Sequence, residues 1–350
     1  MAKKLNKLMA ISQPLFFFLL NIAIIVIFWI SSKMINVGTL QVGQLVAFIE
    51  YLFHAMFSIM LFSMVFVMYP KAQVSANRIM EVLNTEPIIK SPKNGIKDTE
   101  NKGTIEFENV SFTYPNGEEP VIKDVSFSGK KGEVIAFIGS TGSGKSTLIN
   151  LIPRFYDVTK GSIKIDGVDV RDYDLKYLRK KIGFIPQKTL LFTGSIANNI
   201  KFGKKDAEYK EVEDSAKIAQ AYEFISNKPN KFDEIITEGG SNVSGGQKQR
   251  LSIARAIVRK PDIYIFDDSF SALDFKTDAI LRKELRSETK DAIVLIVAQR
   301  IGSIMDADKI IVLNEGEVVG IGTHKELIKN CHIYHEIATS QLTEEELANE

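Results

Sequence analysis

The sequence predicts an α/β fold with a largely parallel sheet, preceded by two helices that cross a membrane. Three observations predict it. Residues 13–69 are nearly all apolar, whereas residues 90–350 have the composition of an ordinary soluble domain. From residue 104 onward, short apolar runs of strand type alternate with helical patterns, as in domains built around parallel strands. A glycine-rich turn at residues 139–146 joins one such run to a helical one.

Length and composition bound the remaining possibilities. The chain has 350 residues, which suits two or three structural units. Its formal net charge of +1 gives no electrostatic case for a nucleic-acid partner. Cys331 is the single cysteine, so the chain can form no internal disulfide, and this suits a reducing cytosolic location.

Two long apolar segments near the N-terminus predict membrane helices at about residues 13–31 and 42–70. The first covers roughly 27 Å at 1.5 Å per residue, close to the hydrocarbon thickness of a bilayer. It lacks the small-residue cleavage site of a signal peptide, and the second apolar segment follows directly. A buried hydrophobic hairpin is the alternative, although nothing else in the chain is apolar enough to cover both helices.

Charged and polar residues predict how these helices lie. Lysines precede the first helix, Lys71 and Arg78 follow the second, and the loop between them carries only Lys33. Both ends should therefore face the cytoplasm. Glu50 and His54 share one face of the second helix, and polar groups at membrane depth usually face protein or water. They either line a substrate path, or lie near the membrane surface or against other helices.

The rest of the sequence divides into segments of different composition. Residues 71–88 show apolar residues at helical spacing, so residues 1–88 are expected to form a partial membrane domain. Residues 89–103 are polar, with Pro and Gly, which is typical of a linker. An α/β domain is expected over residues 104–340, followed by a C-terminal tail over 341–350. Strands are predicted at residues 105–110, 133–139, 162–166, 182–186, 263–268, 292–298 and 309–314, the last opening a hairpin over 309–319.

The turn at residues 139–146 is a complete match to the phosphate-binding pattern G-x-x-x-x-G-K-[ST]. Its glycines allow positive φ, so that backbone N–H groups and the following helix N-terminus can point at a phosphate. Lys145 is expected to reach the β- and γ-phosphates of ATP, and the Ser146 hydroxyl to ligate Mg²⁺. A chance Gly/Ser loop is the alternative, which the flanking strand and helix oppose. The predicted nucleotide-binding residues here are Gly139, Ser140, Thr141, Gly142, Ser143, Gly144, Lys145, Ser146 and Thr147.

A second acidic element is predicted to hold the metal. Residues 263–268 form an apolar run that ends in two aspartates, which is typical of a buried strand delivering its C-terminal end to a ligand. Asp267 is the natural Mg²⁺ partner, directly or through water. Many strands end in Asp, so this interpretation depends on the glycine-rich turn earlier in the chain.

At residues 244–247, Ser-Gly-Gly-Gln running into KQRLSIARAI, the chain resembles the ATPase domains of ABC transporters. The resemblance covers residues 104–340 and includes Tyr114 before the glycine-rich turn, Gln187 in GFIPQ, and the SALD segment at residues 271–274. It implies a P-loop NTPase fold with a mostly parallel sheet, an antiparallel β subdomain and an α-helical subdomain.

Residues 1–88 resemble the last two membrane helices of an ABC exporter subunit, whose family pattern has six. The resemblance implies an N-terminally truncated exporter subunit or a fragment of one. It also implies a multi-pass protein of the cell membrane, in contact with lipid, whose ATP-binding domain lies in the cytoplasm. A non-functional remnant is the alternative.

The resemblance further implies roles for individual residues. Tyr114 is expected to stack on the adenine ring, with a core aromatic as the alternative. Gln187 is expected to reach Mg²⁺ or the attacking water. The signature begins a helix whose N-terminus faces a phosphate, and in this family that phosphate belongs to ATP on a second subunit, arranged head to tail. The signature residues are Ser244, Gly245, Gly246 and Gln247.

The predicted catalytic residues are Gln187, Asp268 and Gln299, and the last two depart from the family pattern. Asp268 stands where the family usually has a glutamate general base, and its shorter side chain places the carboxylate about 1.5 Å further back, although a base must be near its proton. Gln299 stands where the family usually has a histidine; it can donate a hydrogen bond to the γ-phosphate but cannot carry a positive charge.

The intact signature beside an altered catalytic position predicts one subunit of a heterodimeric exporter. Its own site would hold ATP and turn it over slowly, while its signature would complete the site of the partner. A regulatory nucleotide-binding subunit is the alternative. A soluble ABC protein acting on DNA or ribosomes is disfavoured by the apolar hairpin and the lack of a basic patch.

Overall fold

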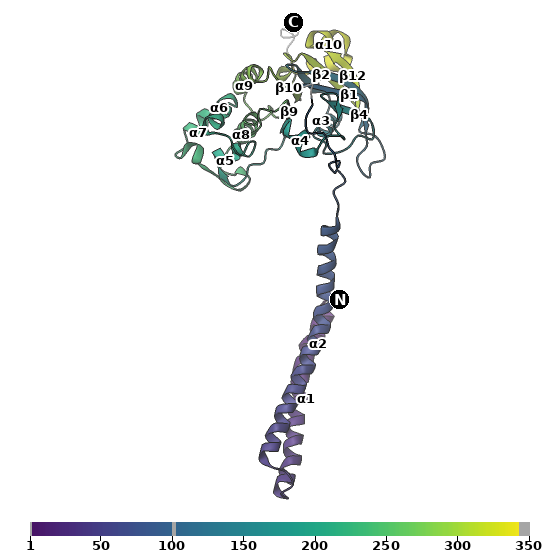
Figure 1. Ribbon diagram of the computed structural model, residues 1–350, viewed down its shortest axis with the longest axis vertical. Coiled ribbons are helices and arrows are strands. Elements are labelled where there is room, and N and C mark those ends of the chain that lie inside the picture. The colour runs from purple at the N-terminus through teal and green to yellow at the C-terminus, as the bar shows by residue number, and fades with distance from the viewer. Residues whose placement is uncertain (1, 100–102, 343–350) are drawn as a thin grey trace. The chain divides into compact units, whose positions relative to one another are not determined.

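A computed structural model describes residues 2–99 and 103–342, which belong to two units (Figure 1). The first unit ends at Pro87 and the second begins at Ile88. Predictions that concern residues 100–102 of the linker and 343–350 of the tail lie outside the described residues.

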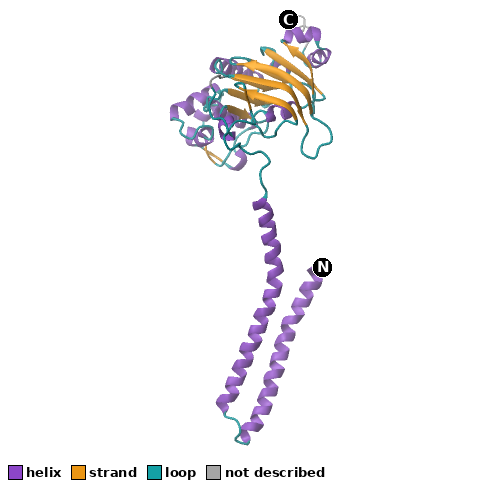
Figure 2. Ribbon diagram, turned by 45° about the vertical axis from the view of Figure 1, so that its right-hand side comes forward, coloured by secondary structure: helices purple, strands orange, loops and turns teal. Residues whose placement is uncertain are grey.

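The first unit contains two long helices, α1 (Ala2–Asn36) and α2 (Val42–Asn84), which run antiparallel and side by side (Figure 2). The helix α1 extends beyond the predicted span 13–31 at both ends. The helix α2 continues past residue 70 to Asn84, within the segment 71–88 where helical spacing of apolar residues predicts such an extension. The predicted spans followed apolar composition, whereas helical hydrogen bonds continue through polar residues of good helix propensity such as lysine. At the start of α2, the Gln41 backbone N–H donates to Gln44 Oε1 at 3.0 Å.

Both helices contain a stretch long and apolar enough to cross a membrane, Pro14–Asn36 in α1 and Val42–Leu83 in α2. Their large apolar side chains mostly point outward; Trp29, for example, is 67% exposed. Glu50 and His54 are also exposed on α2. An apolar surface of this extent requires a covering of lipid or of other protein.

The second unit is built around a six-stranded sheet in the order β12-β11-β3-β10-β9-β6. The strands from β11 to β6 are parallel, and β12 pairs with β11 as the predicted antiparallel hairpin. The fold class is therefore α/β with a mostly parallel sheet, as predicted. The strands are β3 (Val134–Ile138), β6 (Ile182–Ile185), β9 (Ile263–Asp267), β10 (Ile293–Val297), β11 (Lys309–Asn314) and β12 (Glu317–Gly322).

An antiparallel sheet in the order β2-β1-β4-β5 forms the predicted β subdomain. The strand β2 was not predicted, because polar residues interrupt its apolar residues so that no continuous apolar run marks it. A two-stranded pair, β7 with β8, lies among the helices. The strands are β1 (Thr104–Phe112), β2 (Ile122–Lys130), β4 (Lys160–Ile165), β5 (Val168–Asp169), β7 (Gly194–Ser195) and β8 (Ile235–Ile236).

Short helices complete the second unit, and those from α5 to α8 gather into the predicted α-helical subdomain (Figure 1). The helices are α3 (Lys145–Leu151), α4 (Leu175–Lys180), α5 (Ile196–Lys201), α6 (Tyr209–Ile218), α7 (Tyr222–Ser226), α8 (Gly245–Ile257), α9 (Phe275–Glu288), α10 (His324–Asn330) and α11 (His332–Thr339), with 3-10 turns at Lys231–Asp233, Glu238–Gly240 and Ile301–Ser303.

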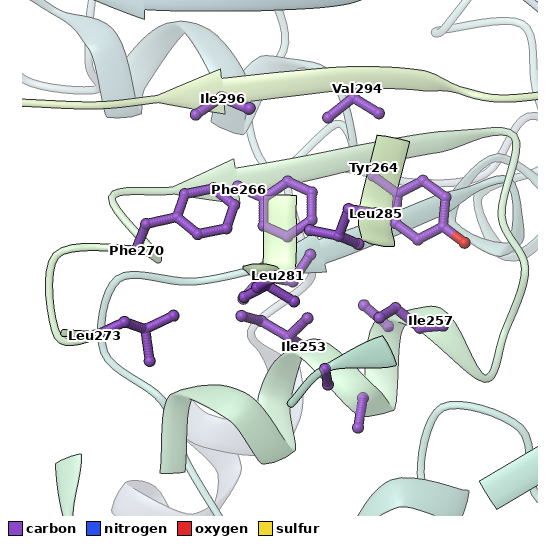
Figure 3. Packing of buried hydrophobic residues seen from close by; sticks show 14 of the residues in the cluster. Ile253, Ile257, Tyr264, Phe266, Phe270, Leu273, Leu281, Leu285, Val294 and Ile296 are labelled. Atoms are coloured by element: carbon purple, nitrogen blue, oxygen red, sulfur yellow. The ribbon is translucent and has the colours of Figure 1, made fainter. Parts of the chain in front are cut away.

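The strand β9 is buried on both faces, as its continuous apolar sequence predicts. Ile263 and Ile265 pack in a cluster shared with the antiparallel sheet. Tyr264 and Phe266 pack in a second cluster with side chains of α8 and α9, such as Leu281 (Figure 3). Because both faces of β9 are covered, packing fixes the position of its last residue, Asp267, and of Asp268, which follows it.

The segment that precedes β1 is attached to the α/β unit by hydrogen bonds. The Ile96 backbone N–H donates to Asp172 O at 2.9 Å, and Asp174 N–H donates back to Ile96 O at 3.1 Å. Ser91 Oγ accepts from the Leu175 backbone N–H at 3.0 Å. The described part of the predicted linker therefore has a defined course.

Candidate functional site

The glycine-rich turn connects the end of β3 to the start of α3, which is the context that the sequence predicts. Gly142 and Gly144 have φ of 86° and 96°, in the left-handed region where glycine is favoured. At Gly139 a Cβ would lie 2.0 Å from Leu313 O, so a larger residue would clash with β11. The backbone can therefore make the tight turn that aims N–H groups at an anion.

The ammonium group of Lys145 folds back onto the turn. Its Nζ donates to Gly139 O at 2.8 Å and to Ser140 O at 2.7 Å. Burial lowers the pKa of Lys145, although the nearby carboxylates of Asp268 and Asp267 act in the opposite direction. A buried cation held mainly by neutral carbonyls is well suited to accept phosphate oxygens as partners.

Two oxygen ligands of the kind that Mg²⁺ prefers lie next to each other. The Ser146 hydroxyl donates to Asp267 Oδ1 at 2.8 Å. Burial raises the pKa of Asp267, while the bond from Ser146 and the charge of Lys145 lower it in part. Among the described residues, no three His, Cys, Asp or Glu side chains form a cluster that could hold a metal alone. The donor set fits Mg²⁺, which is usually bound by one or two carboxylates together with waters and substrate phosphates.

The predicted catalytic residues meet at one carboxylate oxygen. Gln299 Nε2 donates to Asp268 Oδ2 at 2.8 Å, and Gln187 Nε2 donates to the same oxygen at 3.1 Å. Asp268 has a φ of 47°, and its backbone N–H donates to Val297 O at 3.0 Å. Two neutral amides therefore hold the oxygen that a general base would need for its proton.

These groups share one cavity of about 360 Å³. The structure thus brings together the second half of the glycine-rich turn, the last residue of β9 (Asp267), the adjoining Asp268, and both glutamines. Gly139, Ser140 and Ser143 belong to the same turn but do not line the cavity in the described structure. The lining residues are Val121, Thr141, Gly142, Gly144, Lys145, Ser146, Thr147, Gln187, Asp267, Asp268, Val297 and Gln299.

Tyr114 lies beside this cavity without lining it. Its hydroxyl and Thr147 Oγ1 are 2.9 Å apart and share a hydrogen bond. The ring packs edge-on against Phe112 and Tyr156, with centroids 4.8 and 5.2 Å away. Tyr114 is therefore tied to the first turn of α3, and its stacking on a nucleotide base stays a prediction.

The signature residues begin the helix α8, as predicted, but lie apart from the cavity within the described structure. The Ser244 Oγ accepts from Gln247 N–H at 3.3 Å, and Gln247 Oε1 accepts from Ser244 N–H at 3.0 Å. Gly245 is exposed, and a Cβ on Gly246 would lie 3.1 Å from Ala272 O, so the signature packs against the SALD segment. Ser244 and Gly245, at the start of α8, are exposed.

Several residues of the site carry no sequence signal that would have revealed them. Val121 and Val297 are apolar lining residues whose placement follows only from the fold. Thr189 Oγ1 donates to Gln249 Oε1 at 2.7 Å, which joins the segment after Gln187 to α8. Such pairings depend on tertiary contacts between distant residues, which single-residue patterns do not contain.

Comparison with known proteins decides the family. Residues 122–271 match the ABC transporter family. The chain is 42% identical over 339 residues to an uncharacterised ABC transporter ATP-binding protein, YfiB, of Bacillus subtilis, covering 97% of this chain and 58% of that protein. The chain belongs to the ABC transporter family.

Other ABC transporter proteins agree with this assignment. A putative multidrug export ATP-binding/permease protein of Bacillus subtilis, YgaD, is 38% identical over 304 residues, covering 87% of this chain and 52% of that protein. The structure of a bacterial Atm1-family ABC exporter with ATP bound superimposes with a TM-score of 0.78 at 31% identity, covering 87% of this chain and 53% of that chain. This ABC transporter chain thus spans little more than half the length of these relatives.

Proposed function

We propose that this chain is the ATP-binding subunit of an ABC-type membrane exporter, in which binding and cleavage of Mg·ATP are coupled to transport. The single observation that carries the proposal is the shared cavity of Lys145, Ser146 and Asp267, formed by a strand–turn–helix of the phosphate-binding type. The relatives named as export proteins, and the ATP bound in the similar exporter, support the same function.

The triphosphate would be held by the backbone N–H groups of the glycine-rich turn and by the N-terminus of α3. Lys145 would exchange its two carbonyl partners for β- and γ-phosphate oxygens, gaining charge-assisted bonds. Mg²⁺, held by Ser146, Asp267 and the Gln187 amide oxygen together with phosphate, would neutralise the charge that develops on the phosphates. Tyr114 would stack on the adenine ring.

Hydrolysis at this site is proposed to be slow. Asp268 is short for a general base, and its Oδ2 already accepts from the amides of Gln299 and Gln187. Gln299 can donate to the γ-phosphate but supplies no positive charge to it. The site would therefore retain ATP longer than it cleaves it.

A second subunit is proposed to complete the nucleotide site. Ser244, Gly245, Gly246 and Gln247 do not line the cavity of Lys145 in the described structure, yet they form an exposed helix start that suits phosphate. Head-to-tail pairing would place this signature on the ATP of a partner. Because the signature is intact and the catalytic position is altered, the partner is proposed to be a different exporter subunit that carries the active base.

The two helices of the first unit are proposed to span the cell membrane, with the ATP-binding domain in the cytoplasm. Their exposed apolar side chains need a lipid or protein cover, and the basic residues Lys71 and Arg78 follow the apolar segment at residues 42–70. Material that stays in the membrane pellet after alkaline washing and leaves it with detergent would support this placement; release without detergent would contradict it.

Binding of a fluorescent ATP analogue, N-methylanthraniloyl-ATP, to the full chain in detergent micelles tests the proposed function. Affinity is expected to require Mg²⁺, to fall by at least about a hundredfold in Lys145→Ala, and to stay unchanged in Lys325→Ala, which removes an exposed lysine of α10. Magnesium-independent binding, or equal affinity in the two variants, would refute the proposal.

A regulatory nucleotide-binding subunit is the second candidate, and the two amides on Asp268 Oδ2 favour it. In that function ATP stabilises an assembly and cleavage is not needed. Phosphate release by the chain alone and with a co-expressed exporter subunit separates the candidates. Stimulation that depends on the signature residue Ser244 supports the exporter, whereas partner binding without any change in hydrolysis supports the regulatory function.

A further inference from the structure

The chain beyond α11 returns to the loop that follows β10. Residues 341–350 were predicted as a tail, yet the first two of them are described and in contact with the α/β unit. Leu342 packs against the cluster of buried apolar side chains that includes Ile301. The adjacent side chain of Gln341 therefore comes to lie beside the loop that carries Gln299.

Gln341 makes two hydrogen bonds to the backbone of this loop. Its Nε2 donates to Gln299 O at 2.9 Å, and its Oε1 accepts from the Ile301 N–H at 2.9 Å. The two bonds bracket the single residue between, so one amide group sets the orientation of the peptide units on both sides of Arg300. The Ile301 N–H begins a 3-10 turn, and a turn start of this kind needs an acceptor.

Gln299, whose backbone carbonyl accepts from Gln341, directs its own side chain toward the cavity. Its Nε2 donates to Asp268 Oδ2 at 2.8 Å, and Gln299 lines the cavity together with Lys145. Before this point the loop is attached to the sheet, where Ala298 N–H donates to Phe137 O at 3.1 Å. Gln341 supplies the next attachment, immediately beyond the Gln299 α-carbon.

We propose that Gln341 is a positioning residue that holds Gln299 in place to contact the γ-phosphate of ATP. The inference rests on the proposed function. The Gln341 side chain itself does not touch the nucleotide; it fixes the Gln299 carbonyl, and so the direction in which the Gln299 amide projects. Its effect should therefore appear in the preference of the site for ATP over ADP, since these differ at the γ-phosphate.

The test measures dissociation constants of N-methylanthraniloyl-ATP and N-methylanthraniloyl-ADP, each with Mg²⁺, for the full chain in detergent micelles. In Gln341→Ala the affinity for the ATP analogue is expected to fall about fivefold, while that for the ADP analogue stays within about twofold. Gln341→Glu keeps an oxygen that accepts from the Ile301 N–H but replaces the Nε2 donor with a second oxygen, which faces the Gln299 carbonyl. A similar loss of affinity for the ATP analogue is therefore expected. If Gln341→Ala fails to fold, Gln341→Glu carries the test.

Two controls separate positioning from a general structural effect. Ser340→Ala removes the neighbouring hydroxyl, which among residues 2–99 and 103–342 bonds only to Ile337 O, at 2.7 Å, and should leave both affinities unchanged. In a Gln299→Ala background, Gln341→Ala should have no further effect, because a residue that acts through Gln299 is coupled to it.

The outcomes distinguish the two proposals. Equal losses of affinity for the two analogues would overturn the positioning function while leaving nucleotide binding in place. So would a loss of affinity that Gln341→Ala still causes in the Gln299→Ala background. An unchanged preference in both Gln341 variants would do the same. A wild-type chain without magnesium-dependent affinity would overturn the proposed function and this inference with it.

Discussion

The two ends of the nucleotide cavity differ in how completely they are equipped. At the end formed by α3, Lys145, Ser146 and Asp267 supply a cation and two oxygen ligands that line the same cavity. At the other end, Asp268 and Gln299 supply a short acid and a neutral amide that bond to each other. Both ends meet where β9 ends, because Asp267 is the last residue of the strand and Asp268 follows it directly.

This difference leads to the prediction that two adjacent residues, Asp267 and Asp268, contribute separately to binding and to cleavage of a nucleotide. Two adjacent residues differ in their partners: Asp267, the last residue of β9, accepts from the Ser146 hydroxyl, whereas Asp268, just beyond the strand, accepts from two amides. Substitutions at one position should therefore affect cleavage, and substitutions at the other should affect binding. Four predictions follow this division, beginning with the largest expected effect.

The largest effect is expected for Asp268→Glu, which lengthens the candidate base by one methylene. Because a positioned general base contributes at least about a hundredfold to the rate, hydrolysis at this site should rise by about that factor. Phosphate release by the purified chain, alone and with a co-expressed exporter subunit, measures the change. Asp268→Asn serves as the control and should give no increase. Wild-type hydrolysis at roughly 1–10 s⁻¹, an ordinary enzyme rate, would contradict the proposed slow site.

The next effect concerns Asp267→Asn, at the binding end. The amide can still accept from Ser146 Oγ but has no charge for Mg²⁺, so affinity for N-methylanthraniloyl-ATP with Mg²⁺ should fall about tenfold. The magnesium-free affinity should change little. Titration of Mg²⁺ at fixed analogue measures the shift. An equal effect of Asp268→Asn on the same titration would erase the distinction between the two positions.

A smaller effect is expected at Tyr114, which lies outside both ends. Tyr114→Ala removes the ring proposed to stack on adenine and should weaken binding of the ATP analogue about fivefold. Tyr114→Phe keeps the ring and loses only the bond to Thr147 Oγ1, so a change of about twofold or less is expected. If the two variants weaken binding equally, the hydroxyl bond matters and stacking does not.

The smallest effect concerns the stability of the nucleotide-free chain. Burial raises the pKa of Asp267, so the folded state disfavours its ionised form. The carboxyl contribution to stability is therefore present at low pH and is lost as the pH rises through the raised pKa. Asp267→Asn should unfold at a higher temperature than wild type at about pH 8, with a smaller difference at about pH 5. A difference that grows as the pH falls would contradict the buried-carboxyl argument.

The sequence allowed the parallel strands to be predicted because their apolar runs are continuous. The run at residues 263–268 predicted a doubly buried strand, and β9 is buried on both faces. The β2 strand escaped prediction because its solvent-facing residues are polar and its apolar residues are spaced apart. A continuous apolar run predicts a strand that is buried on both faces. A strand buried on one face only has apolar residues at spaced positions, which is a weaker signal in the sequence.

The candidate site was predictable where one short segment carries the chemistry. The glycine-rich turn and the two aspartates at the end of the apolar run 263–268 could be located from local patterns. The sharing of Asp268 Oδ2 by two amides could not, since Gln187, Asp268 and Gln299 lie far apart in the sequence and meet only in the folded sheet. Gln341 is a similar case, because glutamine near a C-terminus has no distinctive pattern.

The hydrogen bond from Thr189 Oγ1 to Gln249 Oε1 links the loop after Gln187 to the helix α8. Gln249 is buried in α8, so separating it from Thr189 would strand polar atoms away from water, at an energetic penalty. The loop after Gln187 and the helix after Ser244 should accordingly shift in concert. In a paired assembly, a movement of the loop after Gln187 at one nucleotide site would therefore also move the signature helix α8 at the other site, and the two sites would be coupled.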